Sequence, residues 1–189
     1  RKDNKDVSAQ FKSKNYQILK SKSDLNQANS TQPILGLFHK EALPYDIDRL
    51  NDKDLGNSTP SLKQMTSKAI QNLKGHPNGF VLQVEGGKVD WAAHANDASG
   101  LIYDQLAFDD AVEEAIQFAE EDGETLVIIT TDHGNANPGM MYGKDVNENF
   151  DRLQNFKGTN EQVLNSISKN ETASQVQDII KEYNGYGIS

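Results

Sequence analysis

The sequence predicts an α/β protein, a three-layer sandwich with a mostly parallel sheet, followed by a small and mainly helical C-terminal segment. Four short runs of apolar residues lack polar alternation, which is typical of strands buried on both faces. Helical patterns separate these runs, and a strand–helix–strand order favours parallel pairing through a right-handed crossover. No strand pattern appears after residue 139. We therefore predict a core of residues 1–139 and a helical segment of residues 140–189.

The elements follow in order from local signals. The predicted strands are residues 16–20, 34–38, 80–84 and 126–130. The predicted helices are residues 6–14, 99–121, 161–168 and 172–183, with a helical turn at 24–28 and a further helix ending before Gly75. In that further helix Thr59 is the expected N-cap and Pro60 the first helical position. Residues 39–59 are polar and irregular, so we predict a long surface loop.

Composition excludes several classes of function. The 189 residues carry 28 acidic and 19 basic side chains, a formal net charge of −9. Broad nucleic-acid binding is therefore not expected, because it needs Lys and Arg on the phosphates. The absence of cysteine excludes disulfides, thiol catalysis and Cys-ligated zinc. We find no signal peptide and no run of about 20 apolar residues that would span a membrane.

Hard-to-bury side chains follow the last two predicted strands directly. Glu85, Asp90 and His94 come after the third strand, while Asp132 and His133 come after the fourth. Ligand sites in parallel α/β sheets lie beyond the carboxyl ends of strands, so we expect these side chains to converge. The spacing of Asp90 and His94 would place both on one side of a helical turn. Carboxylate with imidazole suits zinc, and carboxylate with other oxygens suits magnesium.

Alternatives remain open at each of these positions. Asp-His-Gly after a strand can be a simple turn, and Asp90 with His94 can be a surface pair. His39 and His76 lie in or beside predicted loops, where exposed histidines without a role are common. The acidic residues of helix 99–121 are interpreted as its solvated face rather than as a calcium site.

The motifs VEGGKVDWAAH and TLVIITTDHGN, on either side of the long helix, closely resemble those of the alkaline phosphatase family. PILGLF and TPSLKQMTSKAI resemble the family's preceding segments, so the resemblance covers roughly residues 1–138 and implies an alkaline-phosphatase-like fold. It implies hydrolysis of phosphate monoesters with two zinc ions and one magnesium ion, through attack by a serine and a phosphoserine intermediate. A phosphodiesterase or phosphomutase of the same superfamily matches these motifs less well.

The resemblance also implies roles for individual residues. Glu85 resembles the magnesium ligand, Asp90 and His94 resemble ligands of the first zinc, and Asp132 and His133 resemble ligands of the second zinc. Trp91 occupies a position where the family varies between Lys, His and Trp. It is therefore a candidate substrate-binding residue, with simple packing as the alternative.

The departures from the family pattern matter equally. No Asp-Ser-Ala sequence supplies the nucleophilic serine, and no His-Thr-Gly sequence supplies the third histidine of the first zinc. We therefore interpret the chain as an internal fragment, catalytically inactive by itself, with residues 140–189 as an insertion or cap. The alternative is a non-catalytic metal-binding or scaffold domain that reuses the motif. For the intact parent, the resemblance implies an extracellular or cell-envelope location and a possible homodimer.

Overall fold

The computed structural model describes residues 6–139 and 143–187. The chain folds into two compact units that interleave along the sequence. The first unit contains the described residues up to 43 together with residues 56–84 and 110–127. The second unit contains residues 44–55 and 85–109 and the described residues from 128 onward.

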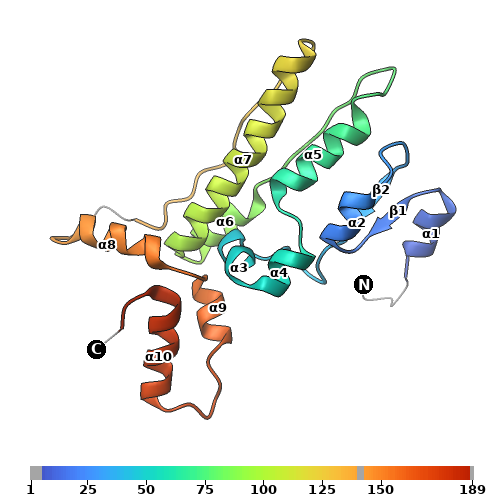
Figure 1. Cartoon of the computed structure of the whole chain (residues 1–189). Coiled ribbons are helices and arrows are strands. Elements are labelled where there is room, and N and C mark those ends of the chain that lie inside the picture. Colours follow the sequence, from blue (N-terminus) through green and yellow to red (C-terminus); the bar gives the residue numbers. More distant parts are fainter. Residues whose placement is uncertain (1–5, 140–142, 188–189) are drawn as a thin grey trace. The chain divides into compact units, whose positions relative to one another are not determined.

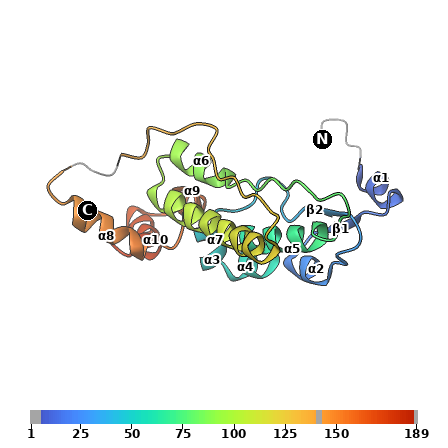
Figure 2. The same ribbon diagram turned by 90° about the horizontal axis from the view of Figure 1, so that it is seen from above.

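A small parallel sheet lies in the first unit. Strand β1 (Gln17–Leu19) pairs with β2 (Ile34–Gly36) in parallel, and helix α2 (Lys22–Gln27) lies between them in the chain. Figures 1 and 2 show the two strands side by side, preceded by the short helix α1 (Ser8–Ser13). The parallel pairing through a crossover, predicted from the order of the apolar runs, is confirmed.

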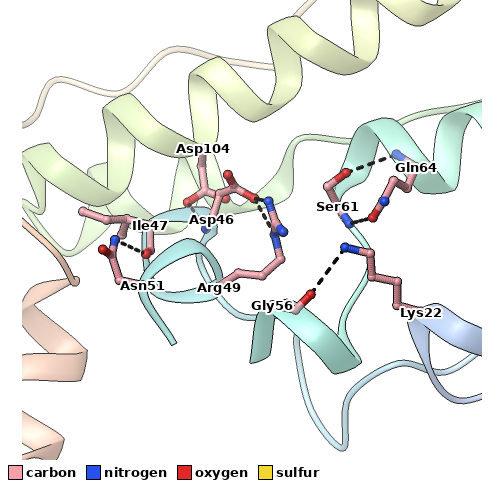
Figure 3. Close-up of polar contacts among 9 residues, drawn as sticks. All are labelled: Lys22, Asp46, Ile47, Arg49, Asn51, Gly56, Ser61, Gln64 and Asp104. Atoms are coloured by element: carbon pink, nitrogen blue, oxygen red, sulfur yellow. Dashed lines mark hydrogen bonds and ion pairs between the residues drawn. The ribbon is translucent and has the colours of Figure 1, made fainter. Parts of the chain in front are cut away.

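Helix α5 (Leu62–Leu73) belongs to the same unit and contacts α2. Its N-cap is Ser61, whose hydroxyl accepts from the Gln64 backbone N–H while the Gln64 side chain accepts from the Ser61 N–H (Figure 3). The prediction that Thr59 caps this helix was wrong. This reciprocal capping box satisfies two N–H groups at once, and Thr59 and Pro60 are instead buried just before it.

The second unit is built around helices. Its core contains Tyr45, Ile47 and Ala92, with Leu101, Tyr103 and Phe156 packed against them. Tyr45 precedes helix α3 (Asp46–Asn51), and Ala92 lies on α6 (Gly87–His94). The long helix α7 (Ala98–Asp122) agrees closely with the predicted 99–121 and contributes residues to both units.

The prediction of a surface loop over residues 39–59 was wrong in the second half of this range. Helix α3 and helix α4 (Lys53–Ser58) occupy most of its second half. The sequence of α3 is rich in Asp and Asn, so it shows no clear helical pattern. Tertiary burial of Ile47 and Asp48 stabilises the helix. Tertiary burial of two residues has overridden weak local propensity.

The described part of the C-terminal segment contains short helices. They are α8 (Val146–Arg152), the 3₁₀ turn η1 (Leu153–Asn155), α9 (Asn160–Asn165) and α10 (Ala173–Asn184). Thr172 caps α10 in a capping box with Gln175, as the sequence indicates, and α9 and α10 are in contact (Figure 1). Residues 140–142 of the predicted segment lie outside the described residues. The domain boundary near residue 139 stays a prediction.

The prediction of a third and a fourth strand was also wrong. Residues 80–84 and 126–130 have no strand structure, and β1 and β2 are the strands found among the described residues. Val81 is 96% exposed and Leu126 is 82% exposed. An apolar strand needs hydrogen-bonded neighbours and covered faces. The described residues pair no strand with either run, and they leave the side chains of Val81 and Leu126 uncovered.

No helix in the described ranges is long and apolar enough to cross a membrane.

Candidate metal centre

Helix α6 carries Asp90 and His94 four residues apart. The helix begins after Gly86, where a Cβ would lie 2.9 Å from the Phe108 ring, so glycine permits this close approach to α7. One helical turn then brings His94 Nε2 to 3.4 Å from Asp90 Oδ1. The pair predicted from spacing is therefore formed, and both side chains reach solvent.

The loop after residue 130 folds onto Asp90. His133 Nε2 lies 4.0 Å from Asp90 Oδ1 and 3.7 Å from Asp132 Oδ2. The Asn135 side chain donates to Asp90 Oδ1 at 3.0 Å. Within the loop, the Thr131 hydroxyl donates to the His133 carbonyl at 2.6 Å. The Asp90 carboxylate thus contacts a side chain of its own helix and side chains of the loop.

An open cavity of about 290 Å³ lies at this meeting point. Its lining includes His94, His133, Asn135 and Asn137. His94 is 71% exposed and Asp132 is 89% exposed, so the side chains have room to turn toward a ligand. The cavity beside these side chains is polar and open at the surface rather than closed.

Glu85 stands apart from the other four candidates. It is exposed, and its Oε1 would lie 3.2 Å from a Cβ at Gly87, so the carboxylate rests against that glycine. The close contacts of 3.4–4.0 Å that link Asp90, His94, Asp132 and His133 do not extend to Glu85. Within residues 6–139 and 143–187, no group of three or more His, Asp or Glu side chains has an arrangement that could hold a metal ion.

The pairwise geometry nevertheless fits the chemistry of zinc in part. Two donors each about 2.1 Å from a tetrahedral ion lie about 3.4 Å apart. The His94–Asp90 separation equals that value, and the His133–Asp132 separation is 3.7 Å. Each pair can therefore offer two of the four ligands that a tetrahedral zinc ion needs.

Trp91 lies beside Asp90 on the same helix and is 52% exposed. The Lys88 ammonium lies 4.2 Å from the centre of the Trp91 ring and 4.0 Å from that of Tyr45. Sequence patterns indicated neither Lys88 nor Asn135. The Asn135 contact spans 45 residues, and the stack on Tyr45 also joins distant parts of the chain.

A partly buried carboxyl, that of Asp104, lies on α7. Asp104 Oδ2 accepts from the Asp46 backbone N–H at 3.1 Å, and Arg49 pairs with the Asp46 side chain (Figure 3). Burial, followed by the charge of Asp46, raises the pKa of Asp104 from 3.8 to about 7, against the N–H bond from Asp46 and the Lys88 charge. Between these two values the folded protein binds more protons than the unfolded chain, so its stability falls as the pH rises.

Replacing Asp104 with asparagine is therefore expected to stabilise the protein above pH 7. The amide carbonyl can still accept from Asp46, while the cost of a buried charge disappears. After allowance for solvent screening, we expect a gain of about 1–2 kcal/mol at pH 8 and little change at pH 4. Urea unfolding at both pH values measures this. Asp109→Asn, the same change at an exposed position of α7, is the control, and an equal effect of both variants would contradict the prediction.

The fold and the centre define an α/β protein with paired carboxylate and imidazole groups, an arrangement that many hydrolases use. The family model described as alkaline phosphatase matches residues 1–184. Alkaline phosphatase 4 of Bacillus subtilis is 36% identical over 185 residues, which is 97% of this chain and 37% of that protein. The chain belongs to the alkaline phosphatase family.

Solved structures agree with this assignment. The alkaline phosphatase of Thermus thermophilus matches with a TM-score of 0.90 at 34% identity, covering 100% of this chain and 40% of that one. A variant phosphatase of the Antarctic bacterium TAB5, solved with magnesium bound, matches with a TM-score of 0.54 at 34% identity over 65% of this chain and 34% of that one. The predicted α/β fold class is confirmed, and the chain spans about two fifths or less of the length of these relatives.

Proposed function

We propose that this chain forms the metal-binding part of a phosphate-monoester hydrolase that uses two zinc ions and one magnesium ion. One observation carries the proposal: Asp90, in a chain of the alkaline phosphatase family, meets His94 from its own helix and His133 and Asn135 from the loop. The donor set fits zinc in part, as two pairs of ligands. Magnesium prefers oxygen ligands, which Glu85 can supply.

Each metal ion is assigned its own ligands among these residues. Asp90 and His94 would hold the first zinc, Asp132 and His133 the second, and Glu85 the magnesium. When bound, the zinc pair supplies Lewis acidity at the oxygens entering and leaving phosphorus, and a water of lowered pKa. Asn135 donates to Asp90 and so fixes the direction of that carboxylate, which is the usual role of a hydrogen-bonding partner behind a ligand.

The isolated chain is expected to bind zinc weakly and to lack phosphatase turnover. The sequence contains neither Asp-Ser-Ala nor His-Thr-Gly, so it offers neither the family's nucleophile nor its third histidine ligand. An incomplete ligand set leaves the ion's charge poorly compensated. Calorimetry with ZnCl₂ and hydrolysis of p-nitrophenyl phosphate measure the two properties, and nanomolar affinity or zinc-dependent turnover lost in Asp132→Ala would contradict them.

A chimera separates this proposal from the alternative of a non-catalytic scaffold. The chain replaces the matching segment of Bacillus subtilis alkaline phosphatase 4, so that the remaining residues come from the relative. We expect hydrolysis of p-nitrophenyl phosphate, and a loss of about 10³-fold or more in kcat/KM for His133→Ala. Asp151→Ala, an exposed carboxylate on α8, is the control. A folded chimera without activity would favour the scaffold.

A further inference from the structure

Two Asn-Gly pairs occur in the sequence, at residues 78–79 and 184–185. In both pairs the glycine has a left-handed backbone, with a φ of 71° at Gly79 and of 75° at Gly185. Glycine adopts this conformation without strain, and it has no side chain to shield its own peptide nitrogen. The two pairs therefore share their chemistry and the conformation of the glycine, and they differ in their surroundings.

The first pair, Asn78–Gly79, lies in an exposed turn that follows helix α5. The Gly79 N–H donates to the His76 carbonyl at 3.0 Å, and the Asn78 N–H donates to His76 Nδ1 at 3.4 Å. Within the part of the chain that the structure describes, no atom beyond the adjacent residues lies within 4 Å of a Cβ placed on Gly79. Opening this turn therefore breaks short-range hydrogen bonds at the surface and leaves the packing around it intact.

The second pair, Asn184–Gly185, is held at the end of a helix. Asn184 is the last residue of α10, and the Gly185 N–H donates to the Lys181 carbonyl at 2.9 Å. The Asn184 side-chain oxygen is buried, and a Cβ placed on Gly185 would lie 2.7 Å from Asn155 Cβ. Any rearrangement of this pair therefore requires the last turn of α10 to unwind and to move away from Asn155.

We propose that Asn78 is a site of spontaneous deamidation, and that the fold exposes Asn78 to this reaction while it protects Asn184. The Gly79 nitrogen forms a bond to Asn78 Cγ, the bond from Cγ to Nδ2 breaks, and ammonia leaves with the proton of the Gly79 N–H. Water then opens the resulting succinimide ring at one of its two carbonyl groups. Opening at Cγ gives an aspartyl residue, and opening at the main-chain carbonyl gives an isoaspartyl residue.

The reaction changes the chain immediately before an apolar run. Both products carry a negative charge that asparagine lacks, and the isoaspartyl form also adds a methylene group to the main chain. Residues 80–84 follow directly, and the Phe80 ring lies 6.0 Å from the Phe118 ring of α7, measured between the ring centres. Deamidation therefore alters charge and backbone length two residues before the ring that packs the start of this run against α7.

Both sites can be followed in one sample of the full chain, incubated at mildly alkaline pH and digested with trypsin. The digest places them in the separate peptides 75–88 and 182–189, each with a single asparagine, and mass spectrometry detects the replacement of NH₂ by OH. In the folded protein we expect peptide 75–88 to deamidate at least about tenfold faster, and in guanidinium chloride we expect nearly equal rates. No deamidation of peptide 75–88 in the folded protein, equal rates there, or a ratio unchanged by guanidinium chloride would overturn the proposal.

A pair of glycine variants tests the ring closure itself. In Gly79→Ala a methyl group shields the attacking nitrogen, so we expect deamidation of Asn78 to slow by about tenfold or more. Gly75→Ala is the matched control, because Gly75 is exposed, has open space around it and does not follow an asparagine. Far-ultraviolet circular dichroism shows that both variants are folded. An unchanged rate in folded Gly79→Ala, or equal slowing in Gly75→Ala, would contradict attack by the Gly79 nitrogen.

Discussion

Replacement of Asp97 by alanine or asparagine is expected to destabilise the protein strongly, because this carboxylate satisfies buried donors from two segments. Asp97 is 3% exposed. Its Oδ1 accepts from the Ser99 hydroxyl at 2.9 Å and the Gly100 N–H at 2.8 Å. Its Oδ2 accepts from the Asn160 N–H at the start of α9. Asp97 therefore ties the junction of α6 and α7 to the C-terminal segment.

Asp48 also binds the C-terminal segment, and we call the hydrogen bonds of Asp97 and Asp48 to this segment the clamp. Its Oδ1 accepts from the Thr159 N–H at 2.8 Å, and its Oδ2 accepts from the Thr159 hydroxyl at 2.9 Å. Thr159 is 1% exposed and also caps α9 by accepting from the Gln162 N–H. Burial raises the pKa of Asp48, against the two bonds from Thr159 that lower it. The charge of Asp48 is thus held at some cost.

The two aspartates should respond differently to the same isosteric change. In Asp97→Asn an amide NH₂ would replace an oxygen that faces N–H donors, and a backbone N–H cannot reverse its direction. We expect a loss of about 3–5 kcal/mol for Asp97→Ala and nearly as much for Asp97→Asn. In Asp48→Asn the amide can donate to the Thr159 hydroxyl, which can rotate, so the expected loss is about 1 kcal/mol.

Urea unfolding at pH 7, followed by far-ultraviolet circular dichroism, gives the midpoint of each variant. The matched pair Asp97→Asn and Asp48→Asn carries the test, since both remove one buried negative charge. Equal midpoints for these two variants would show that the donors around Asp97 can rearrange and that the clamp is not as rigid as its geometry indicates.

Local patterns in the sequence predicted the elements whose stability is largely local. The parallel pair β1–β2 follows from two short apolar runs joined by a helical crossover, and α10 follows from the Thr172 cap and its apolar stripe. The Asp90–His94 pair follows from helical spacing alone. These features depend on neighbours within a few turns of the chain, so periodicity and capping rules suffice.

Features that depend on distant parts of the chain were not predictable in the same way. Helix α3 depends on burial of Ile47 and Asp48, and the latter binds Thr159, which is 111 residues away. The contact of Asn135 with Asp90 and the stack of Lys88 on Tyr45 likewise join separate segments. The apolar runs at 80–84 and 126–130 were predicted as strands from their local pattern and are not strands. An apolar pattern indicates a strand, but it does not supply the neighbouring strands with which the run must pair.

Those two unpaired runs are expected to make the chain self-associate. Leu126 is 82% exposed, Ile128 is 75% exposed and Ile129 is 57% exposed, in an uninterrupted apolar sequence. An exposed, unpaired apolar segment is a template for pairing with another chain. Concentration-dependent oligomers in sedimentation velocity are the expected result for the parent protein.

The double variant Leu126→Lys and Ile128→Lys is expected to prevent this association. The two positions alternate, so a strand formed on pairing would place both on one face. Burying each side chain is worth about 1.5–3 kcal/mol, and their loss should weaken association by about 100-fold or more. Leu164→Lys, which adds a lysine at a 68%-exposed leucine on α9, is the control for added charge. A parent protein that stays monomeric at high concentration, or a control that disperses the oligomers equally well, would show that these runs do not drive association.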